Sequence, residues 1–384
     1  MIPSIPKIGL YQPYPHSFGG LQAVVVKLAR ALPDFGFEPI IISPEPGQFT
    51  ERLRAENLPF MVSDPGDDWH VYGRGANALS YLTSPKRIFS LWRYWRKLSR
   101  DLRDRSIALL HCNDYRAVML AAPAAHLAGI PVIWHMHGFV SSRLANLLAS
   151  ALVQWTVPVS KGMLDYLGSV RTLFGKCRVI HNGLETDSAD LVGTPRDSTT
   201  PLILAIGTLH PRKRYETLLR AFHEVLTYCH EAECWIVGGE FGDGSYARHL
   251  RAMAATLGLD GKLKFTGHSS AVHDYLRRSS LLVIPSRIEA FGMVAIEAMQ
   301  AGKPVVACRT GGLPDIIVHG KTGFLIDTDD HIGMASAIVK LLKNHSLAKN
   351  MGMAGRSRVQ EHFTVRKMTA SFADFYTGLL RKAA

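Results

Sequence analysis

Short apolar runs alternate with amphipathic stretches along the first half of the chain. Ile8 to Tyr11 is the first apolar run, and EPIIIS, which ends at Ser43, is the second. Between them, Leu21 to Leu32 repeats its apolar residues at helical spacing. Four further apolar runs are IALLH, IPVIWHMHG, WTVPVS and CRVIHNG, with helical patterns between most of them. Strands that alternate with helices predict a parallel sheet covered on both faces.

A polar, turn-rich segment, ETDSADLVGTPRDSTTP, interrupts this alternation from Glu185 to Pro201. The pattern then restarts with the runs LILAIGT, ECWIVGG, LKFTG, LLVIPS, KPVVACR and GFLID, and helical stretches separate the first of these. We therefore predict an α/β chain of two doubly wound, Rossmann-like domains, residues 1–184 and 201–367, joined by a linker at 185–200. A last helix, about 368–384, is expected to pack back on the first domain. Ligands of such sheets bind outside the carboxyl ends of the strands, so we expect a site in a cleft between the domains.

The composition supports two domains and sets limits on location. A chain of 384 residues with 47% apolar residues is too long for one ordinary core. We see no signal peptide at the start, and the apolar runs are broken by prolines, so we expect no membrane span. The five cysteines are scattered and form no CxxC pair, which predicts reduced thiols and a cytoplasmic protein.

The net charge of +12 favours anionic partners, and much of it is concentrated in one predicted helix. Lys86 to Arg105 holds eight basic and two acidic residues. Its apolar residues recur at helical spacing and predict one stripe: Ile88, Leu91, Trp92, Trp95, Leu98 and Leu102. Two interpretations stay open. The helix is a solvated face of the first domain, or it contacts an anionic membrane surface, such as the inner face of the cell membrane, as a lipid-linked acceptor would require. Nucleic-acid binding is not expected, since no known motif accompanies the charge.

The stretch PSRIEAFGMVAIEAMQAGKPVV holds two carboxylates in an otherwise apolar setting. Glu289 is predicted in the loop after a buried strand, and Glu297 on a helix from about Phe291 to Gln300. Gly292 lets a ligand approach the first free amides of that helix, where the helix dipole favours a phosphate. A sugar nucleotide suits this arrangement, with the two carboxylates accepting hydroxyls of the sugar and the ribose. The alternative is a pair of ordinary surface glutamates.

This stretch and the residues after it, AGKPVVACRTGGLPDIIVHGKTGFLI, resemble the signature of the retaining glycosyltransferases of family four. Other matching segments follow the family's order along nearly the whole chain: FGGLQ, HMHG, VPVSKGM, VIHNGLE, GTLHPRKRYETLLRAF and IVGG. The resemblance implies the GT-B architecture and a nucleotide-sugar donor bound mainly by the second domain. It also implies an acceptor on the first domain, and transfer with retention and without a metal.

The resemblance assigns roles to individual residues. Glu289 would hold the donor sugar and Glu297 the ribose, while His137 would contact the sugar beside the anomeric carbon. Lys213 matches the family's diphosphate-binding lysine, but Thr208 stands where the family has an arginine. Further expected residues are Arg212 at the diphosphate; Gly19, Gly20, Gly207, Gly238, Gly239, Phe291, Gly292, Met293 and Val294 along the donor; His268 near the base; and His135 on the acceptor side.

The sequence thus predicts a glycosyltransferase that uses a nucleoside-diphosphate sugar, of the UDP or GDP type, and no cofactor or metal. The acceptor is a glycan, a lipid-linked glycan or a small molecule. Two alternatives are a sugar-nucleotide epimerase of the same architecture and a polyanion-binding protein with a vestigial site. The segment DTDD, from Asp327 to Asp330, resembles a metal motif of other transferases, but we interpret it as a loop and helix cap.

Overall fold

A computed structural model describes residues 5–16, 18–69, 84–140, 142–168, 176–186 and 200–383. The chain divides into two compact units, which are described separately. The first unit comprises Met1–Gly183 together with Val365–Ala384, and the second comprises Leu184–Thr364. Residues 187–199, most of the predicted linker, lie outside the described residues.

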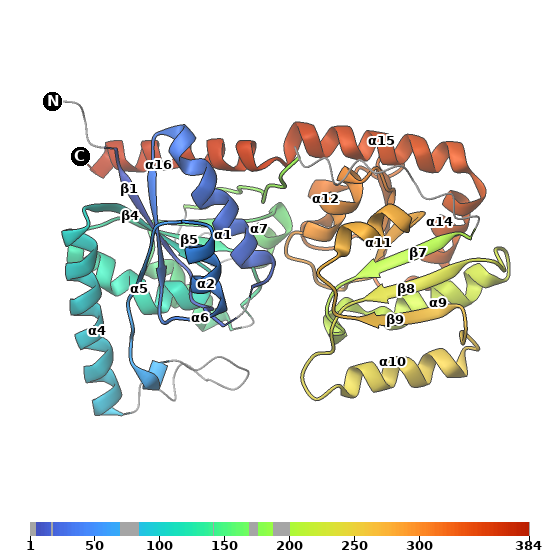
Figure 1. Cartoon of the computed structure of the whole chain (residues 1–384), viewed down its shortest axis with the longest axis horizontal. Coiled ribbons are helices and arrows are strands. Elements are labelled where there is room, and N and C mark those ends of the chain that lie inside the picture. The colour runs from blue at the N-terminus through green and yellow to red at the C-terminus, as the bar shows by residue number, and fades with distance from the viewer. Residues whose placement is uncertain are drawn as a thin grey trace. The chain divides into compact units, whose positions relative to one another are not determined.

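The first unit is built on a six-stranded parallel sheet with the order β3-β2-β1-β4-β5-β6. Figure 1 labels β1, β4 and β5 of this sheet. The strands are β1 (Lys7–Tyr11), β2 (Glu38–Ser43), β3 (Phe60–Val62), β4 (Ile107–Asn113), β5 (Val132–Met136) and β6 (Trp155–Pro158). The helices are α1 (Gly20–Ala31), α2 (Gln48–Ala55), α4 (Pro85–Asp104), α5 (Tyr115–Ala128), α6 (Arg143–Ala151), α7 (Lys161–Leu167) and α16 (Val365–Ala383).

Alternating side chains of β5 show which helices cover which face of this sheet. Trp134 packs edge-on against Tyr115 of α5. His135, the next residue, points to the opposite face, where its ring lies 4.9 Å from that of Phe372 on α16. Helix α16, the last in the chain, therefore covers the face opposite α5, and α4 packs alongside α5.

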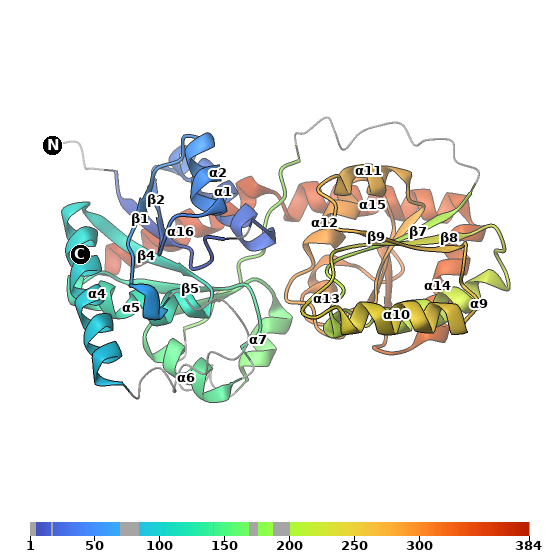
Figure 2. The ribbon, with the colours of Figure 1, turned by 60° about the horizontal axis from the view of Figure 1, so that its bottom comes forward.

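The second unit repeats the same plan with the strand order β12-β11-β10-β7-β8-β9. Its strands are β7 (Leu202–Ile206), β8 (Glu233–Val237), β9 (Leu263–Gly267), β10 (Leu281–Ile284), β11 (Val305–Cys308) and β12 (Gly323–Ile326). Its helices are α9 (Tyr215–Leu226), α10 (Ser245–Thr256), α11 (Val272–Arg278), α12 (Met293–Gln300), α13 (Leu313–Ile316), α14 (His331–Lys343) and α15 (His345–His362). Figure 2 shows α9 and α10 on one side of the sheet, with α11 and α12 on the other.

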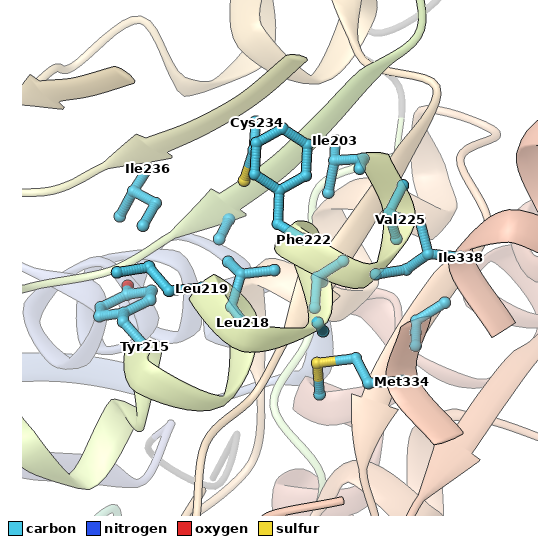
Figure 3. Close-up of a cluster of buried hydrophobic side chains, with 14 of the residues drawn as sticks. Ile203, Tyr215, Leu218, Leu219, Phe222, Val225, Cys234, Ile236, Met334 and Ile338 are labelled. Atoms are coloured by element: carbon cyan, nitrogen blue, oxygen red, sulfur yellow. The ribbon is translucent and has the colours of Figure 1, made fainter. Parts of the chain in front are cut away.

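The core of the second unit explains why α9 lies where it does. Figure 3 shows the ring of Phe222 of α9 beside Cys234 of β8 and Ile203 of β7, and Leu218 of the same helix belongs to this cluster. Met334 of α14 closes the same cluster, and these side chains are at most 1% exposed. Apolar residues at helical spacing on α9 pack against every second residue of the strands. The helical and the strand patterns of the sequence therefore contribute to the same core.

Both sheets therefore have the doubly wound order, which confirms the predicted α/β class. In each sheet, successive strands are added first toward one edge and then toward the other. The change occurs between the two central strands, which are β1 and β4 in the first unit and β7 and β10 in the second. Ligands of doubly wound sheets bind outside the carboxyl ends of strands at this switch point. A ligand-binding site is therefore expected in the loops that follow these four strands. Among the described helices, none combines the length and the apolar character needed to cross a membrane.

The predicted apolar stripe of α4 is partly wrong. Leu91, Leu98 and Leu102 are at most 5% exposed, as expected. Ile88 and Trp92, by contrast, are 47% and 44% exposed. Tyr94 takes the buried place because its hydroxyl bonds the Tyr11 hydroxyl across 2.8 Å inside the first unit. That contact rotates the buried face of α4, and Trp92 is left on its flank.

Candidate functional site

The switch point of the second sheet brings Lys213 and Glu289 into contact. Lys213 Nζ lies 2.6 Å from Glu289 Oε2, and the two side chains are only 14% and 16% exposed. Ser286, fully buried just after β10, donates its hydroxyl to the same carboxylate oxygen at 3.2 Å. The loop after β7 and the loop after β10 therefore share one partly buried ion pair, in which the lysine balances the charge of the carboxylate.

The segment after β11 fixes the backbone of Glu289. The amide of Gly312 donates to the Glu289 carbonyl at 3.0 Å. Gly311 has a φ of 51°, and a Cβ atom there would lie 1.7 Å from the same carbonyl oxygen. Only glycine permits this approach. The pair of glycines in RTGGLPD therefore positions a residue more than twenty places earlier in the chain.

Helix α12 begins at Met293, two residues later than predicted, because Gly292 caps it with a φ of 110°. The amides of Met293 and Val294 lie in the first turn, where a helix offers them no acceptor of its own. Glu297 is half-buried one turn further along. Phe291 is only 3% exposed, with its ring 6.0 Å from that of Phe363, so its backbone rather than its side chain is available to a ligand.

Close backbone approach also shapes the loop after β7. Gly207 has a φ of 147°, and the Tyr215 hydroxyl donates to its carbonyl at 2.7 Å. A Cβ atom on Gly238 would lie 2.0 Å from the Gly207 carbonyl oxygen, so Gly238 allows the loops after β7 and β8 to meet. A Cβ atom on Gly239 would meet only the Cβ of His268, at 3.6 Å, and His268 is exposed.

The two arginines that flank Lys213 differ in their surroundings. The side chain of Arg212 is exposed, while its carbonyl accepts from the Arg287 amide at 2.9 Å and links the loops after β7 and β10. Arg214 binds Asp329, with Nη2 2.7 Å from Oδ1. Asp330 caps α14 by accepting from the Gly333 amide at 2.8 Å, which confirms that DTDD forms a loop and a cap.

In the first unit, Gly19 and Gly20 lie at the start of α1, in the loop that follows β1. A Cβ atom on Gly20 would meet nothing within 4 Å, and one on Gly19 would meet only the Gln22 side chain. The Gly19 amide already bonds the Gln22 side chain at 3.1 Å. The space beside both glycines is therefore open, which is compatible with the predicted contact to a phosphate.

Three histidines cluster on the α16 side of the first sheet. The His111 and His135 rings lie 5.0 Å apart, and the His135 and His137 rings 3.8 Å apart. His135 is fully buried and neither ring nitrogen has a partner among the described residues. His137, just beyond the strand, is half-buried. His111 is held from the other side by the Tyr376 hydroxyl, 2.6 Å from its Nδ1.

Burial sets the protonation state of this cluster. Desolvation is the main cause that lowers the pKa of His111 and of His137 to about 3, and for His111 the neighbouring His137 adds to it. The pKa of His135 is also lowered, by desolvation first and then by the other two imidazoles. All three rings are therefore neutral at physiological pH. His135, predicted on the acceptor side, faces Phe372 and not solvent.

The structure adds residues that the sequence analysis did not select. Asp114 follows β4 at the switch point of the first sheet and has a φ of 82°. Its carboxylate accepts from the Tyr115 amide at 2.8 Å and from the Tyr14 hydroxyl at 3.1 Å. Burial raises the pKa of this carboxyl. Asn113 bonds the Tyr11 carbonyl at 3.2 Å and joins the ends of the two central strands. In the sequence, the polar segment NDY directly after an apolar run could have indicated these two residues.

The arrangement can perform a limited set of chemical tasks. Lys213 and the first amides of α12 can neutralise a diphosphate, and Glu289 can accept hydroxyl groups. No group of three or more histidine, cysteine, aspartate or glutamate side chains in the described part of the chain has the geometry of a metal site.

Two family profiles together match most of the chain. Residues 18–188 match the profile described as Glycosyltransferase Family 4, and residues 189–358 match Glycosyl transferases group 1. The chain is 32% identical to the GDP-mannose-dependent alpha-(1-6)-phosphatidylinositol monomannoside mannosyltransferase of Mycobacterium tuberculosis. That alignment covers 73% of this chain and 79% of the mannosyltransferase.

Other relatives match over shorter or more distant stretches. The chain is 31% identical to the N-acetyl-alpha-D-glucosaminyl L-malate synthase of Bacillus anthracis over 47% of its own length, and the match spans less than half, 46%, of that protein. Among solved structures, Anabaena Alr3699/HepE in complex with UDP and glucose superposes with a TM-score of 0.77 at 20% identity. That superposition covers 97% of this chain and 99% of the other, and it shows the shared GT-B fold.

Proposed function

Because this chain belongs to the family-four glycosyltransferases, we propose that it moves a sugar from a nucleoside-diphosphate sugar to an acceptor hydroxyl with retention of configuration. The observation that carries this proposal is the Lys213–Glu289 ion pair, 2.6 Å long, at the switch point between β7 and β10. A cation that suits a diphosphate and a carboxylate that suits sugar hydroxyls lie together at the edge of the sheet where ligands of such sheets bind, which supports the proposal.

Donor binding would exchange the partners of this pair. The diphosphate takes over Lys213, the exposed Arg212 adds a second cation, and the amides of Met293 and Val294 bind phosphate oxygens. Glu289, freed from the lysine, accepts hydroxyls of the sugar, while Glu297 accepts those of the ribose. His137, in the first unit, is proposed to contact the sugar; its neutral imidazole can accept or donate a hydrogen bond to a hydroxyl group.

The transfer step follows from these roles. The bond between the anomeric carbon and the diphosphate oxygen breaks, and its electron pair leaves with the diphosphate. Lys213 and Arg212 stabilise this developing negative charge, which is the largest kind of contribution an enzyme makes to such a step. The acceptor oxygen bonds the anomeric carbon on the same face, and its proton passes to the departing phosphate oxygen. These cations can do the work that a metal does elsewhere, so we propose metal-independent transfer.

The names of the relatives indicate which donors and acceptors to test. One relative is named for GDP-mannose and a phosphatidylinositol mannoside, and a solved neighbour holds UDP and glucose. We propose a UDP or GDP donor, no cofactor, and an acceptor that is a glycan, a lipid-linked glycan or a small molecule.

The exposed part of α4 favours contact with an anionic membrane surface. Phe89 and Trp92 are 58% and 44% exposed, and their rings stack 5.9 Å apart. Arg96 lies 4.8 Å above the Trp92 ring. Both residues line an open surface pocket, together with Arg93, Lys97 and Arg100 of the same helix. Exposed aromatic rings beside cations suit the headgroup region of an anionic bilayer. We therefore propose that the enzyme acts at such a surface, as a lipid-linked acceptor requires.

A donor screen tests the proposed function directly. Melting temperatures are measured with UDP, GDP and ADP and with their sugars, since a ligand that binds only the folded state raises the melting temperature. We expect one nucleotide series to stabilise the protein, and Lys213→Gln to abolish the shift. Turnover of the selected donor with candidate acceptors should persist in EDTA. Donor conversion without an acceptor product would instead support an epimerase, and binding without turnover a vestigial site.

A further inference from the structure

A second pocket of the second unit lies at the edge of its sheet opposite the proposed donor site. Its volume is about 330 Å³, and its walls include residues at the amino ends of three strands: Pro201 directly before β7, Ser280 directly before β10 and Lys303 shortly before β11. Glu289 and Lys213, by contrast, follow the carboxyl ends of β10 and β7. The two sites are therefore at opposite ends of the same central strands, and no residue of this pocket has a role in the proposed transfer.

The lining of this pocket carries positive charge without acidic residues. The cationic side chains come from Arg277, Arg278, Lys303 and Lys349, with His345 beside them, and among the described residues no aspartate or glutamate lines the walls. Arg277 already has a partner in Asp274 on its own helix. Arg278 lies 4.6 Å above the ring of Trp235. The Trp235 ring is neutral, so Arg278 and the two lysines are the cations of this pocket without a carboxylate partner among the described residues.

Lys303 is a half-buried ammonium group with no carboxylate partner in the part of the chain that the structure describes. Its Nζ donates one hydrogen bond, to the Arg277 carbonyl at 2.9 Å, although an ammonium group has three donors. Burial lowers the pKa of this lysine, which reflects the cost of holding its charge away from water. A buried cation without a counter-charge is unfavourable unless a bound anion supplies that charge.

Close packing of two glycines brings the second lysine to the same pocket. A Cβ atom on Gly352 of α15 would lie 1.9 Å from the carbonyl oxygen of Gly302, so α15 is pressed against the turn that precedes Lys303. Lys349 is one turn earlier on α15, exposed, and has no partner among the described residues. His345 lies four residues before it and shares its face of the helix. The close contact between α15 and the turn at Gly302 thus keeps the positive charges of Lys303 and Lys349 in one pocket.

We propose that this pocket is a binding site for a small phosphate-bearing anion, held by Lys303 and Lys349. A phosphate group offers several charged oxygens, which match two ammonium groups and the nearby hydroxyl of Ser280. The volume is at the lower limit of ligand pockets, so inorganic phosphate or a compact phosphate monoester fits and a nucleotide sugar does not. The site is separate from the donor site and independent of the proposed function.

The test is a calorimetric titration of the full chain with inorganic phosphate in a chloride buffer at physiological salt. The wild type should bind phosphate, and Lys303→Met and Lys349→Gln should each weaken binding by about tenfold or more, since each removes a charge-assisted bond. Lys321→Gln removes an exposed lysine elsewhere in the same unit and should leave the affinity unchanged. Folding of each variant is checked by its melting temperature without phosphate.

Crossed variants separate this pocket from the donor site. Lys213→Gln should retain the phosphate binding that Lys303→Met and Lys349→Gln weaken, because that lysine belongs to the opposite edge of the sheet. The proposal is overturned if the wild type does not bind phosphate, or if binding is lost in Lys213→Gln and retained in both pocket variants. Equal weakening by Lys321→Gln would likewise overturn it, because it would reduce the effect to net charge. A second titration with glucose 6-phosphate distinguishes free phosphate from a monoester as the preferred form.

Discussion

At the scale of single residues, Glu289 depends on atoms contributed by three loops. Lys213 balances its charge, Ser286 donates to it, and the glycines at 311 and 312 hold its backbone. This explains why the motif around Glu289 is long. Without Lys213, this partly buried carboxylate would be an unpaired charge, which is costly.

The role of Glu289 can be separated from its structural contacts. Glu289→Gln keeps the size of the side chain and its ability to accept a hydrogen bond from Lys213, but removes the charge. We expect turnover to fall by roughly a hundredfold or more, while donor affinity changes less than about tenfold, because the charge acts mainly on the transition state. Steady-state kinetics and nucleotide titration measure the two effects. Glu231→Gln, which alters an exposed carboxylate 3.9 Å from Lys262, is the matched control.

Equal turnover in Glu289→Gln and the wild type would contradict the assignment. A parallel loss of donor affinity and turnover would mean that Glu289 serves binding alone, which is a different role from the one proposed.

At the scale of elements, α4 shows that amphipathic spacing locates a helix more reliably than it orients one. The sequence predicted the helix, and the observed Pro85–Asp104 agrees closely with it. The hydroxyl contact between Tyr11 and Tyr94, however, joins residues 83 positions apart. No local pattern records that contact, and it leaves Ile88, Phe89 and Trp92 exposed beside the arginines.

The membrane proposal predicts a salt-sensitive interaction of this helix. The triple variant Arg93→Gln, Arg96→Gln and Lys97→Gln should bind anionic phosphatidylserine vesicles about a hundredfold more weakly than the wild type, because each basic residue near such a surface contributes about 1 kcal/mol. Vesicle sedimentation measures the binding. Neutral phosphatidylcholine vesicles should retain neither protein.

A control variant with the same change in net charge carries Arg220→Gln, Lys262→Gln and Lys321→Gln in the second unit. It should sediment with anionic vesicles like the wild type. If both triple variants lose binding equally, the attraction is due to net charge and α4 is an ordinary solvated helix.

At the scale of the whole molecule, the last helix of the chain belongs to the first unit. Helix α16 supplies Phe372 and Tyr376 to the histidine cluster, more than 230 residues after His135. The first unit therefore cannot complete this side of its sheet until the second unit has been synthesised. The buried histidines also tie the stability of the first unit to pH.

Acid should weaken the first unit selectively. The low pKa values of His111 and His137, about 3, mean that the folded unit excludes protons which the unfolded chain takes up below about pH 6.5. Stability is therefore fully present above pH 6.5 and falls as pH drops toward 3. Between pH 7.5 and 5.5 each such histidine should cost about 1.4 kcal/mol. Urea unfolding followed by tryptophan fluorescence measures this loss, since five of the six tryptophans lie before Gly183.

Replacing one histidine of the cluster should make the stability of the first unit less dependent on pH. His135→Leu removes a buried imidazole that makes no hydrogen bond among the described residues, so we expect equal or greater stability at pH 7.5 and a smaller loss at pH 5.5. His126→Gln, at an exposed histidine of the same unit, should leave the slope unchanged. A urea midpoint that does not move between the two pH values would disprove the neutral cluster.

The sequence by itself determined the fold class, the family and the order of the elements, because periodicity and motif spacing are local properties that survive without coordinates. It also placed Glu289 and Lys213 at the ends of strands, and its assignments of roles to site residues remain predictions for the experiments above. Only the tertiary structure decided what meets what: that Lys213 and Glu289 pair, that Tyr94 displaces Trp92, and that His135 is enclosed by α16. It also revealed Asp114 and the cationic pocket around Lys303. These features arise from contacts between residues distant in sequence, and the free energy of such contacts depends on burial and geometry that no local pattern encodes.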